Sequence, residues 1–339
     1  MKQQASKDYV LCTRCILPGT FPGISFDEEG VCNYCRKYRG DRVHEAKKKK
    51  YEQKFLSLLK EHKKTDTYDV IVAYSGGKDS TYTLDVLVNR YKMRALALTF
   101  DNTFISPRAE ENIRQVCGAL GVDLIMVRPA PKMLRRIFAT AARTELYSAK
   151  TLERASTICT SCISFVKGIV LRTALEKEIP FIGYGWSPGQ APVQASVMRT
   201  NAALMRNNQQ TTLQPLLEIE GDDILPFFVT DKQFEQTEKF PWNIHPLAFL
   251  PYDEEKIVER IKEFGWEKPD DTDPNSSNCL LNAYANQIHR NRYHFHPYVW
   301  EIANMVREGV MSREEGLEKI EPPEVERMVM YSKNILDQV

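Results

Sequence analysis

The sequence has almost no excess charge of either sign. Its 46 Lys and Arg residues stand against 45 Asp and Glu residues, which leaves a formal net charge of +1. Such a balance excludes a global attraction to nucleic acid or to an anionic membrane. The chain also lacks any run of about eighteen apolar residues, and its beginning, MKQQASKDYVLCTRC, lacks the apolar segment of a secretory signal. We therefore expect a soluble cytoplasmic protein that does not associate with membranes.

Length and composition are sufficient for a folded core. The chain has 339 residues, 42% of them hydrophobic, and can form one large domain with one or two appendages. It also contains eight cysteines. Disulfides are rare in a reducing compartment, so we expect these cysteines to be metal ligands or reactive thiols.

Four of the cysteines form two C-x2-C pairs near the beginning of the chain. Cys12 and Cys15 are separated by sixteen residues from Cys32 and Cys35. This spacing is typical of a four-thiolate zinc site, in which each pair occupies two corners of a tetrahedron. Four thiolates leave no open position for chemistry, so we predict a structural zinc knuckle over residues 1–40. The alternative is a set of four free thiols.

A charged segment that includes the run AKKKK follows, from Arg36 to Lys64. Its composition favours a solvated helix, and we predict a charged helical linker over residues 41–66. A second interpretation remains open, because clustered lysines beside a zinc knuckle can contact the phosphates of RNA.

From Tyr68 onward the pattern changes to strands that alternate with helices. Apolar runs predict strands at residues 68–74, 94–100, 123–127 and 180–186, and the first is the β-branched kind that is buried on both faces of a parallel sheet. Ser106 and Pro107 predict the beginning of a helix after the second run. The alternation predicts a doubly wound parallel α/β sheet over residues 67–251, with ligands at the carboxyl ends of its strands.

The segment VIVAYSGGKDST, residues 70–81, joins the first strand to a helix. Gly76 and Gly77 allow backbone N–H groups to approach an anion, and the following helix directs its positive end toward the same point. Hydroxyl donors and a cation complete the cradle: Ser75, Ser80, Thr81 and Lys78. It is not a Walker A loop, because Lys78 is followed by Asp79, which is better suited to holding Mg²⁺. We predict a phosphate site.

The motif SGGKDS after a buried strand resembles the PP-loop of the ATP pyrophosphatase, or adenine nucleotide alpha hydrolase, superfamily, and the resemblance extends from about residue 69 to residue 251. It implies a HUP-like fold and cleavage of ATP between its α and β phosphates. It also implies that Ser75, Gly76, Gly77, Lys78, Asp79 and Ser80 form the pyrophosphate loop. By the same resemblance, Phe100 and Asp101 are expected to contact adenosine, and Gly185, in YGWSPGQ, faces the same cleft.

This superfamily activates a carbonyl oxygen as its adenylate so that a nucleophile can displace AMP. The loop and Mg²⁺ stabilise the charge that develops on pyrophosphate. The resemblance implies ATP and Mg²⁺ as cofactors, with Lys78 and Asp79 catalytic. It leaves open whether the nucleophile is nitrogen or sulfur.

The remaining cysteines bear on that choice. Cys117 shares helical spacing with Ile113, Val116 and Leu120 and is expected to be a buried small hydrophobe. Cys159 and Cys162 form a third C-x2-C pair, and Cys279 lies far along the chain. This 2+1 arrangement resembles that of cluster-dependent thiolation enzymes of the superfamily, including tRNA 2-thiolation enzymes. It implies that the three thiolates hold a [4Fe–4S] cluster with one open iron.

Two other interpretations of these three cysteines remain open. A catalytic dithiol at Cys159 and Cys162 can pass persulfide sulfur through a transient disulfide without any metal. The three thiols can also be structural and unrelated to one another.

Both ends of the chain resemble a different group. The stretch CTRCILPGTFPGISFDEEGVCNYC resembles the amino terminus of N-acetyl sugar amidotransferases, which also carry a PP-loop, and EGVMSREEGLEKIEPPE, residues 308–324, resembles their helical carboxyl end. Ammonia transfer has no evident need for the three thiols, and a glutaminase signature is not visible. That activity therefore requires a glutaminase partner, and we rank sulfur insertion first.

The last region, residues 252–339, is predicted to be helical, with Ile257, Ile261 and Phe264 on one face of its first helix. Within it, HRNRYHFHPYVW, residues 289–300, combines histidines, arginines and aromatics. Stacking and phosphate contacts to a nucleotide or RNA are one interpretation, and packing between domains is the other. A metal site at His294 and His296 is disfavoured, because their i,i+2 spacing suits a strand.

Three hypotheses follow from the sequence. In the first, the enzyme is a sulfurtransferase that adenylates a carbonyl of a small molecule, nucleotide or RNA and inserts sulfur from the cluster, with an external sulfur donor. In the second, the same site delivers ammonia to an N-acetyl sugar. In the third, the protein is an ATP-binding redox or iron sensor, which the complete loop with Asp79 argues against. We also expect a homo-oligomer.

Overall fold

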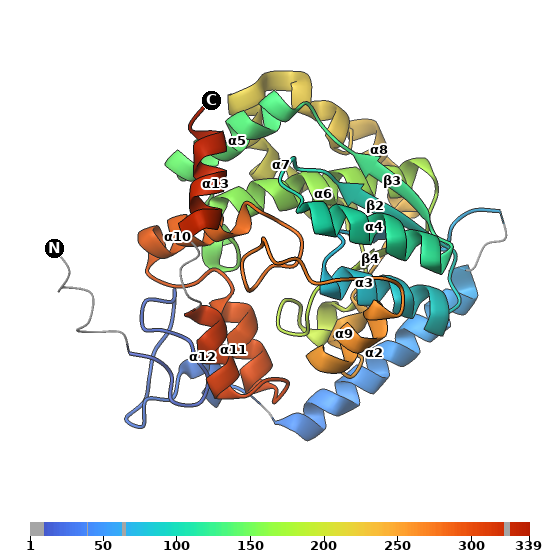
Figure 1. Ribbon diagram of the computed structural model, residues 1–339. Coiled ribbons are helices and arrows are strands. Elements are labelled where there is room, and N and C mark those ends of the chain that lie inside the picture. The colour runs from blue at the N-terminus through green and yellow to red at the C-terminus, as the bar shows by residue number, and fades with distance from the viewer. Residues whose placement is uncertain (1–9, 39, 63–65, 322–325) are drawn as a thin grey trace.

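The computed structural model describes residues 10–38, 40–62, 66–321 and 326–339, and Figure 1 shows their arrangement. The six strands are β1 Val70–Ala73, β2 Ala95–Phe100, β3 Asp123–Val127, β4 Phe181–Tyr184, β5 Val197–Arg199 and β6 Trp242–Ile244. The α-helices are α1 Asn33–Arg36, α2 Asp41–His62, α3 Lys78–Asp85, α4 Pro107–Leu120, α5 Pro131–Arg143, α6 Thr157–Glu176, α7 Ala202–Glu220, α8 Asp231–Glu235, α9 Glu254–Lys262, α10 Asn282–Tyr293, α11 Val299–Arg307, α12 Arg313–Ile320 and α13 Glu326–Leu336.

The strands form one sheet in the order β3-β2-β1-β4-β6-β5. All neighbours are parallel except β5, which pairs with β6 in the antiparallel direction at the edge. The four predicted strands are therefore present, each within one or two residues at either end. The α/β fold class is confirmed.

The sheet is buried on both faces because its strands alternate apolar side chains between two cores. Ile71 points into one core, which also holds α5 and α6, whereas Val70 and Val72 point into the other, which also holds parts of α2, α3 and α4. In β2, Leu96 and Leu98 are two positions apart and both point into the first core, as this alternation requires. A parallel sheet covered on both faces in this way presents its strand ends as the accessible edge.

Helix α6 carries the third C-x2-C pair across one face of the sheet. Among the described residues it is the one helix whose length and composition suit a bilayer span, but 61% of its apolar window is buried. It packs on β1, β2 and β4. Burial of this kind is typical of the core helix of a globular domain.

The charged helix α2 also joins the sheet core. Phe55 is fully buried against Tyr91, Phe181 and Phe249, and Lys54 Nζ donates to the carbonyl of Val197. One side of the predicted solvated linker is therefore part of the α/β core. The lysines of the AKKKK run lie partly exposed or exposed before this contact begins.

A third core joins the two ends of the chain. Ile16, Leu17 and Phe21 of the N-terminal knuckle pack with α11 and α12, which Figure 1 shows beside it. Phe21 stacks on Trp300, with ring centroids 5.4 Å apart. Farther along, α9 packs on α3, and α13 packs on α5 and α10. The C-terminal region is therefore distributed over the α/β sheet and the knuckle.

Candidate active site

One pocket of about 440 Å³ lies at the carboxyl ends of the central strands. Its walls come from the loop after β1, the segment after β4, the beginning of α6, and the C-terminal region from Tyr252 to Lys319. The size is typical of a small-molecule site. The position is where ligands bind in open α/β sheets.

The loop after β1 has a backbone that requires glycine. Gly76 has φ +74°, and a Cβ there would lie 2.6 Å from Ile113 and 2.7 Å from the carbonyl oxygen of Ala109. The indole Nε1 of Trp266 donates to the Gly76 carbonyl at 2.9 Å, which fixes the peptide plane. The loop is thus held against α4 and presents its N–H groups to the pocket.

Hydroxyl groups brace the same loop from inside. Ser75 Oγ and Ser80 Oγ are 3.1 Å apart, and the Gly77 N–H donates to Ser75 Oγ at 3.3 Å. The Lys78 N–H donates to Ser277 Oγ at 3.0 Å, from a segment two hundred positions away in the chain. The helix α3 begins at Lys78 with Gly77 as its N-cap and no side-chain cap. Because the Gly77 and Lys78 N–H groups already have these partners, the donors left for an anion are those later in the first turn of α3.

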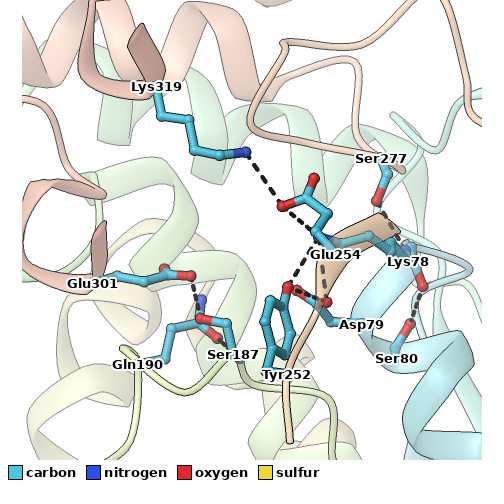
Figure 2. A network of polar contacts seen from close by, with 11 residues as sticks. Lys78, Asp79, Ser80, Ser187, Gln190, Tyr252, Glu254, Ser277, Glu301 and Lys319 are labelled. Carbon is cyan, nitrogen blue, oxygen red and sulfur yellow. Dashed lines mark hydrogen bonds and ion pairs between the residues drawn. The ribbon is translucent and has the colours of Figure 1, made fainter. Parts of the chain in front are cut away.

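A network of charged groups lies at the mouth of this loop (Figure 2). Lys78 Nζ is 3.1 Å from Glu254 Oε2, 3.6 Å from Asp79 Oδ1 and 2.9 Å from Tyr252 Oη. Tyr252 Oη donates to Asp79 Oδ1 at 2.8 Å, and Lys319 Nζ is 3.4 Å from Glu254 Oε2. The network positions Lys78, a cation of the type that binds phosphate, beside Asp79, a carboxylate of the type that binds a divalent cation.

Burial and the neighbouring lysines shift the pKa values of the carboxylates of Asp79 and Glu254. Burial raises the pKa of Asp79, although the charge of Lys78 opposes it. Burial likewise works against the ionised form of Glu254, but the charges of Lys78 and Lys319 outweigh it and lower its pKa. A divalent cation beside Asp79 would favour the ionised carboxylate, so the residue fits the predicted role as a Mg²⁺ ligand.

The three cysteines of the 2+1 pattern reach the same pocket. Cys159 and Cys162 line it from α6, and Cys279 lines it from the segment before α10. Asn102 Nδ2 lies 3.6 Å from the Sγ atoms of both Cys162 and Cys279, and the Asn282 amide nitrogen lies 4.0 Å from Cys159 Sγ. Side chains separated by well over a hundred positions are therefore brought together beside the phosphate loop.

These thiols are not poised as free nucleophiles. Burial raises the pKa of Cys159 to about 12, and it also raises the pKa values of Cys162 and Cys279. A thiol that stays protonated at neutral pH reacts slowly, because the thiolate is the nucleophile. Burial therefore works against the thiolate form, which both a metal-free dithiol and a metal site need. The positive charge of a bound metal would favour the thiolate form of all three cysteines.

The four N-terminal cysteines converge on one point. Cys12 Sγ is 3.8 Å from Cys35 Sγ, Cys15 Sγ is 3.8 Å from Cys32 Sγ, and all four sulfurs lie within 4.8 Å of one another. A tetrahedral ion with Zn–S bonds of about 2.3 Å requires sulfurs about 3.8 Å apart. The donor set therefore fits a single tetrahedral ion. Arg307 Nη2 lies 3.8 Å from Cys15 Sγ and can balance the thiolate charge.

We expect one zinc per chain and a knuckle that depends on it. Cys12→Ser should lose the metal and lower the melting temperature by about 5 °C or more, because the metal stabilises the folded knuckle. Cys117→Ser is the matched control, since this buried thiol lies on α4, outside the four-cysteine group. Elemental analysis and differential scanning calorimetry measure both outcomes. A Cys12→Ser protein that keeps its zinc would contradict the assignment.

Several side chains of the segment HRNRYHFHPYVW pack inside the protein. His289, Phe295 and His296 are buried, and Phe295 contacts Phe21 of the knuckle. Burial lowers the pKa of His296 to about 3. His294 has φ +58° and ends α10, and in the part of the chain that the structure describes neither histidine belongs to a metal-ligating group. The packing interpretation of this segment fits the structure.

Not every residue of the predicted site lines the pocket. Phe100 is buried and stacks on Phe165, and Asp101 forms an ion pair with Arg128 at 2.5 Å. Thr81 is buried with its hydroxyl 3.3 Å from Tyr74 Oη. The structure does not bring these three side chains to the pocket lining. The residue beyond β2 that does line it is Asn102.

Sequence reasoning missed the C-terminal side of the site. Tyr252, Glu254, Ser277, Glu301 and Lys319 all line the pocket, and none of them was among the predicted site residues. Their role follows only from contacts with the loop after β1. The polar run PNSSNC before α10, which contains Ser277, is the local signal in the sequence that would have pointed to this wall.

Gly185, after β4, is in the pocket lining as predicted and permits a close backbone approach. A Cβ there would lie 2.4 Å from Ser80 Cα and 2.6 Å from Ser80 N. Gly185→Ala should therefore push α3 away from the sheet, lower the unfolding free energy by about 2 kcal/mol and weaken ATP binding. Gly118→Ala is the control: a Cβ at this position in α4 meets nothing within 4 Å, and stability should rise by about 0.5 kcal/mol. Chemical denaturation and ATP titration measure both. Unchanged ATP binding by Gly185→Ala would contradict this geometry.

Comparisons with known proteins add little about activity. No family model matches the chain. An uncharacterized protein, MJ1599, from Methanocaldococcus jannaschii is 25% identical over 309 residues, which cover 90% of this chain and 91% of that protein. Among solved structures, the chain is similar to U34-tRNA thiolase NcsA from Methanococcus maripaludis with its [4Fe-4S] cluster. Identity is 17%, the TM-score is 0.39, and the match covers 97% of this chain and 89% of that one. A similarity of this size carries no functional conclusion.

Proposed function

We propose that the protein is an ATP pyrophosphatase of the PP-loop superfamily. In this proposal it adenylates a carbonyl oxygen of its substrate and replaces that oxygen with sulfur from a [4Fe–4S] cluster. One observation carries the proposal: the phosphate loop and the thiols of Cys159, Cys162 and Cys279 line the same pocket. A nucleotide on the loop and a sulfur source on the cysteines would meet across about 440 Å³.

The first half of the reaction uses the loop. The remaining N–H groups in the first turn of α3 and the Lys78 ammonium would hold the β and γ phosphates, and the Gly77 and Lys78 N–H groups would join them only by giving up Ser75 Oγ and Ser277 Oγ. Asp79, positioned by Tyr252 at 2.8 Å, would hold Mg²⁺, which neutralises charge on the departing pyrophosphate. In this structure Lys78 Nζ forms an ion pair with Glu254 Oε2 at 3.1 Å.

The second half uses the three cysteines. The cluster, when bound, supplies sulfide at an iron that no protein thiolate occupies. Cys159, Cys162 and Cys279 would hold its other irons, each through one sulfur, and Asn102 would donate to two of those sulfurs from 3.6 Å. Hydrogen bonds to cluster sulfurs tune its potential. The half-buried position of the cysteines keeps the site accessible to substrate.

An amidotransferase is the second candidate, and the packing of the two chain ends favours it. The segments that resemble N-acetyl sugar amidotransferases form one core, in which Gly316 of α12 packs against Ile16 of the knuckle. From this unit, Glu301 and Lys319 reach the pocket. The carbonyl chemistry would be the same, with ammonia from a partner glutaminase as the nucleophile.

Labelled donors distinguish the two functions. Protein purified without oxygen is incubated with Mg-ATP and with two probes, a bulk RNA fraction and a low-molecular-weight extract of cells that lack the protein. We expect AMP and pyrophosphate as products, and ³⁵S from labelled sulfide in one of the two fractions. Products ADP and phosphate would contradict adenylation. Incorporation of ¹⁵N from labelled ammonia by an iron-free protein, without ³⁵S, would support the amidotransferase instead.

A further inference from the structure

A carboxylate from the C-terminal helices faces the reaction pocket without a cationic partner. Glu301, on the first turn of α11, lines the pocket opposite the phosphate loop. Its Oε1 accepts a hydrogen bond from the buried Ser187 hydroxyl, as Figure 2 shows. No Lys, Arg or His nitrogen among the described residues lies within ion-pair distance of it, although Glu254 beside it has two lysines. An acid that lines a pocket without a cationic partner is a candidate functional group.

The position of Glu301 is rigidly fixed. A Cβ on Gly189 would lie 2.1 Å from the carbonyl oxygen of Glu301, so the loop after β4 and the first turn of α11 touch through backbone. Asn304 Nδ2 donates to the Gly189 carbonyl at 3.0 Å and fastens the same contact one turn later. The Ser187 N–H donates to Gln190 Oε1 at 3.0 Å. Glu301 is therefore held by a loop that begins at a sheet strand.

The surroundings tune this acid. Burial raises the pKa of Glu301 to about 7, hydrogen bonds from Ser187 and Gln190 oppose the rise, and the charge of Asp79 adds to it. Lys78 lowers it slightly, and the buried hydroxyls of Tyr252 and Tyr298 are the other titratable groups that face it. A general base works best when its pKa lies near the operating pH. Glu301 can therefore both take up and release a proton.

We propose that Glu301 is the general base of the adenylation step and that the substrate carbonyl is conjugated to an N–H group, as in an amide, lactam or ureide. This rests on the proposed function and deepens it. A general base acts in its ionised form, and an ionised carboxylate only accepts hydrogen bonds, so the substrate group from which Glu301 takes a proton must be a donor. A substrate carboxylate, by contrast, would be repelled by Glu301 and Asp79 together.

The proton and electron pairs balance without any oxidant. The N–H proton moves to Glu301, the carbonyl oxygen forms a bond to the α phosphorus, and the bond from that phosphorus to the bridging oxygen breaks to release pyrophosphate. Sulfide then forms a bond to the carbon, the carbon–oxygen bond breaks to release AMP, and the proton returns from Glu301 to nitrogen. Sulfur stays at the oxidation level of sulfide throughout.

Single-turnover formation of AMP tests the assignment, with whichever of the two fractions, bulk RNA or low-molecular-weight extract, supports it. Glu301→Gln keeps the shape and the acceptor for Ser187 and should slow AMP formation by about 100-fold or more. Its Mg-ATP affinity should stay unchanged, which a merely structural role would not predict. Glu301→Asp should recover part of the rate. Glu314→Gln, an exposed glutamate on α12, is the charge-matched control.

The pH profile gives an independent readout. The wild-type rate should rise as pH increases through about 7, because the base must be ionised, and the Glu301→Gln profile should lose that limb. A Glu301→Gln rate within threefold of wild type would overturn the assignment while leaving the proposed function intact. Wild-type protein that forms no AMP with either fraction would overturn the proposed function, and the substrate class with it.

Discussion

Cys279→Ala is expected to remove the iron from protein purified without oxygen while leaving its zinc in place. A [4Fe–4S] cluster gives about four irons per chain and a matching amount of acid-labile sulfide. Cys279 lies in the pocket with Cys159 and Cys162, whereas the four N-terminal cysteines lie in a different core. Losing one of three thiolates should leave too few ligands to hold the cluster. Iron and sulfide analysis with visible absorption spectra measures the result.

The same variant separates the two halves of the reaction. AMP and pyrophosphate should still form, because the phosphate loop does not depend on the Cys279 side chain; its neighbours Ser277 and Asn278 make the structural contacts to Lys78 and Ser106. Sulfur incorporation should disappear. Cys117→Ala, which changes a buried thiol outside the pocket, should keep both iron and activity. If Cys279→Ala retains full iron, the three cysteines do not hold the cluster.

Asp79→Asn is expected to lower the rate of ATP cleavage by about 100-fold or more. The substitution keeps the acceptor for the Tyr252 hydroxyl, which donates to Oδ1 at 2.8 Å, so the fold of the loop should survive. What it removes is the negative charge that would hold Mg²⁺ against the pyrophosphate. Raising the Mg²⁺ concentration should restore little of the rate.

Asp222→Asn is the matched control, because Asp222 is exposed and is not among the residues that line the pocket. Its AMP formation should equal that of wild type. Circular dichroism and thermal melting should show that Asp79→Asn remains folded; its melting temperature should not fall, because burial makes the ionised Asp79 unfavourable. An Asp79→Asn enzyme with wild-type turnover would remove Asp79 from the proposed mechanism.

The α/β sheet was predictable because its signals are local. The strand β3 spans the predicted residues 123–127, and α4 begins at Pro107 after the predicted Ser106. Apolar runs and N-terminal proline act within a few residues, so sequence spacing alone carries them. The strands β5 and β6, with three residues each, were missed, since a strand of that length has no readable period.

The strand-to-helix turn after β1 was predictable for the same reason, whereas the opposite wall of the pocket was not. Gly76, Gly77 and Lys78 are consecutive, so one motif contains the whole cradle. Tyr252 and Glu301 reach the site only through tertiary packing of α9 and α11. Phe100 and Asp101 were assigned by resemblance, and the core stacking of Phe100 and the ion pair of Asp101 hold both side chains elsewhere.

We propose that one pocket both adenylates a carbonyl and inserts sulfur. The most direct measurement is a single turnover of iron-loaded protein whose cluster carries ³⁵S, with Mg-ATP and the supporting fraction. We predict that AMP, pyrophosphate and ³⁵S-labelled product form in equal amounts, and that Cys279→Ala forms AMP without labelled product. If iron-free protein forms AMP only when ammonia is present, and no ³⁵S label is transferred, sulfur insertion in this pocket is contradicted.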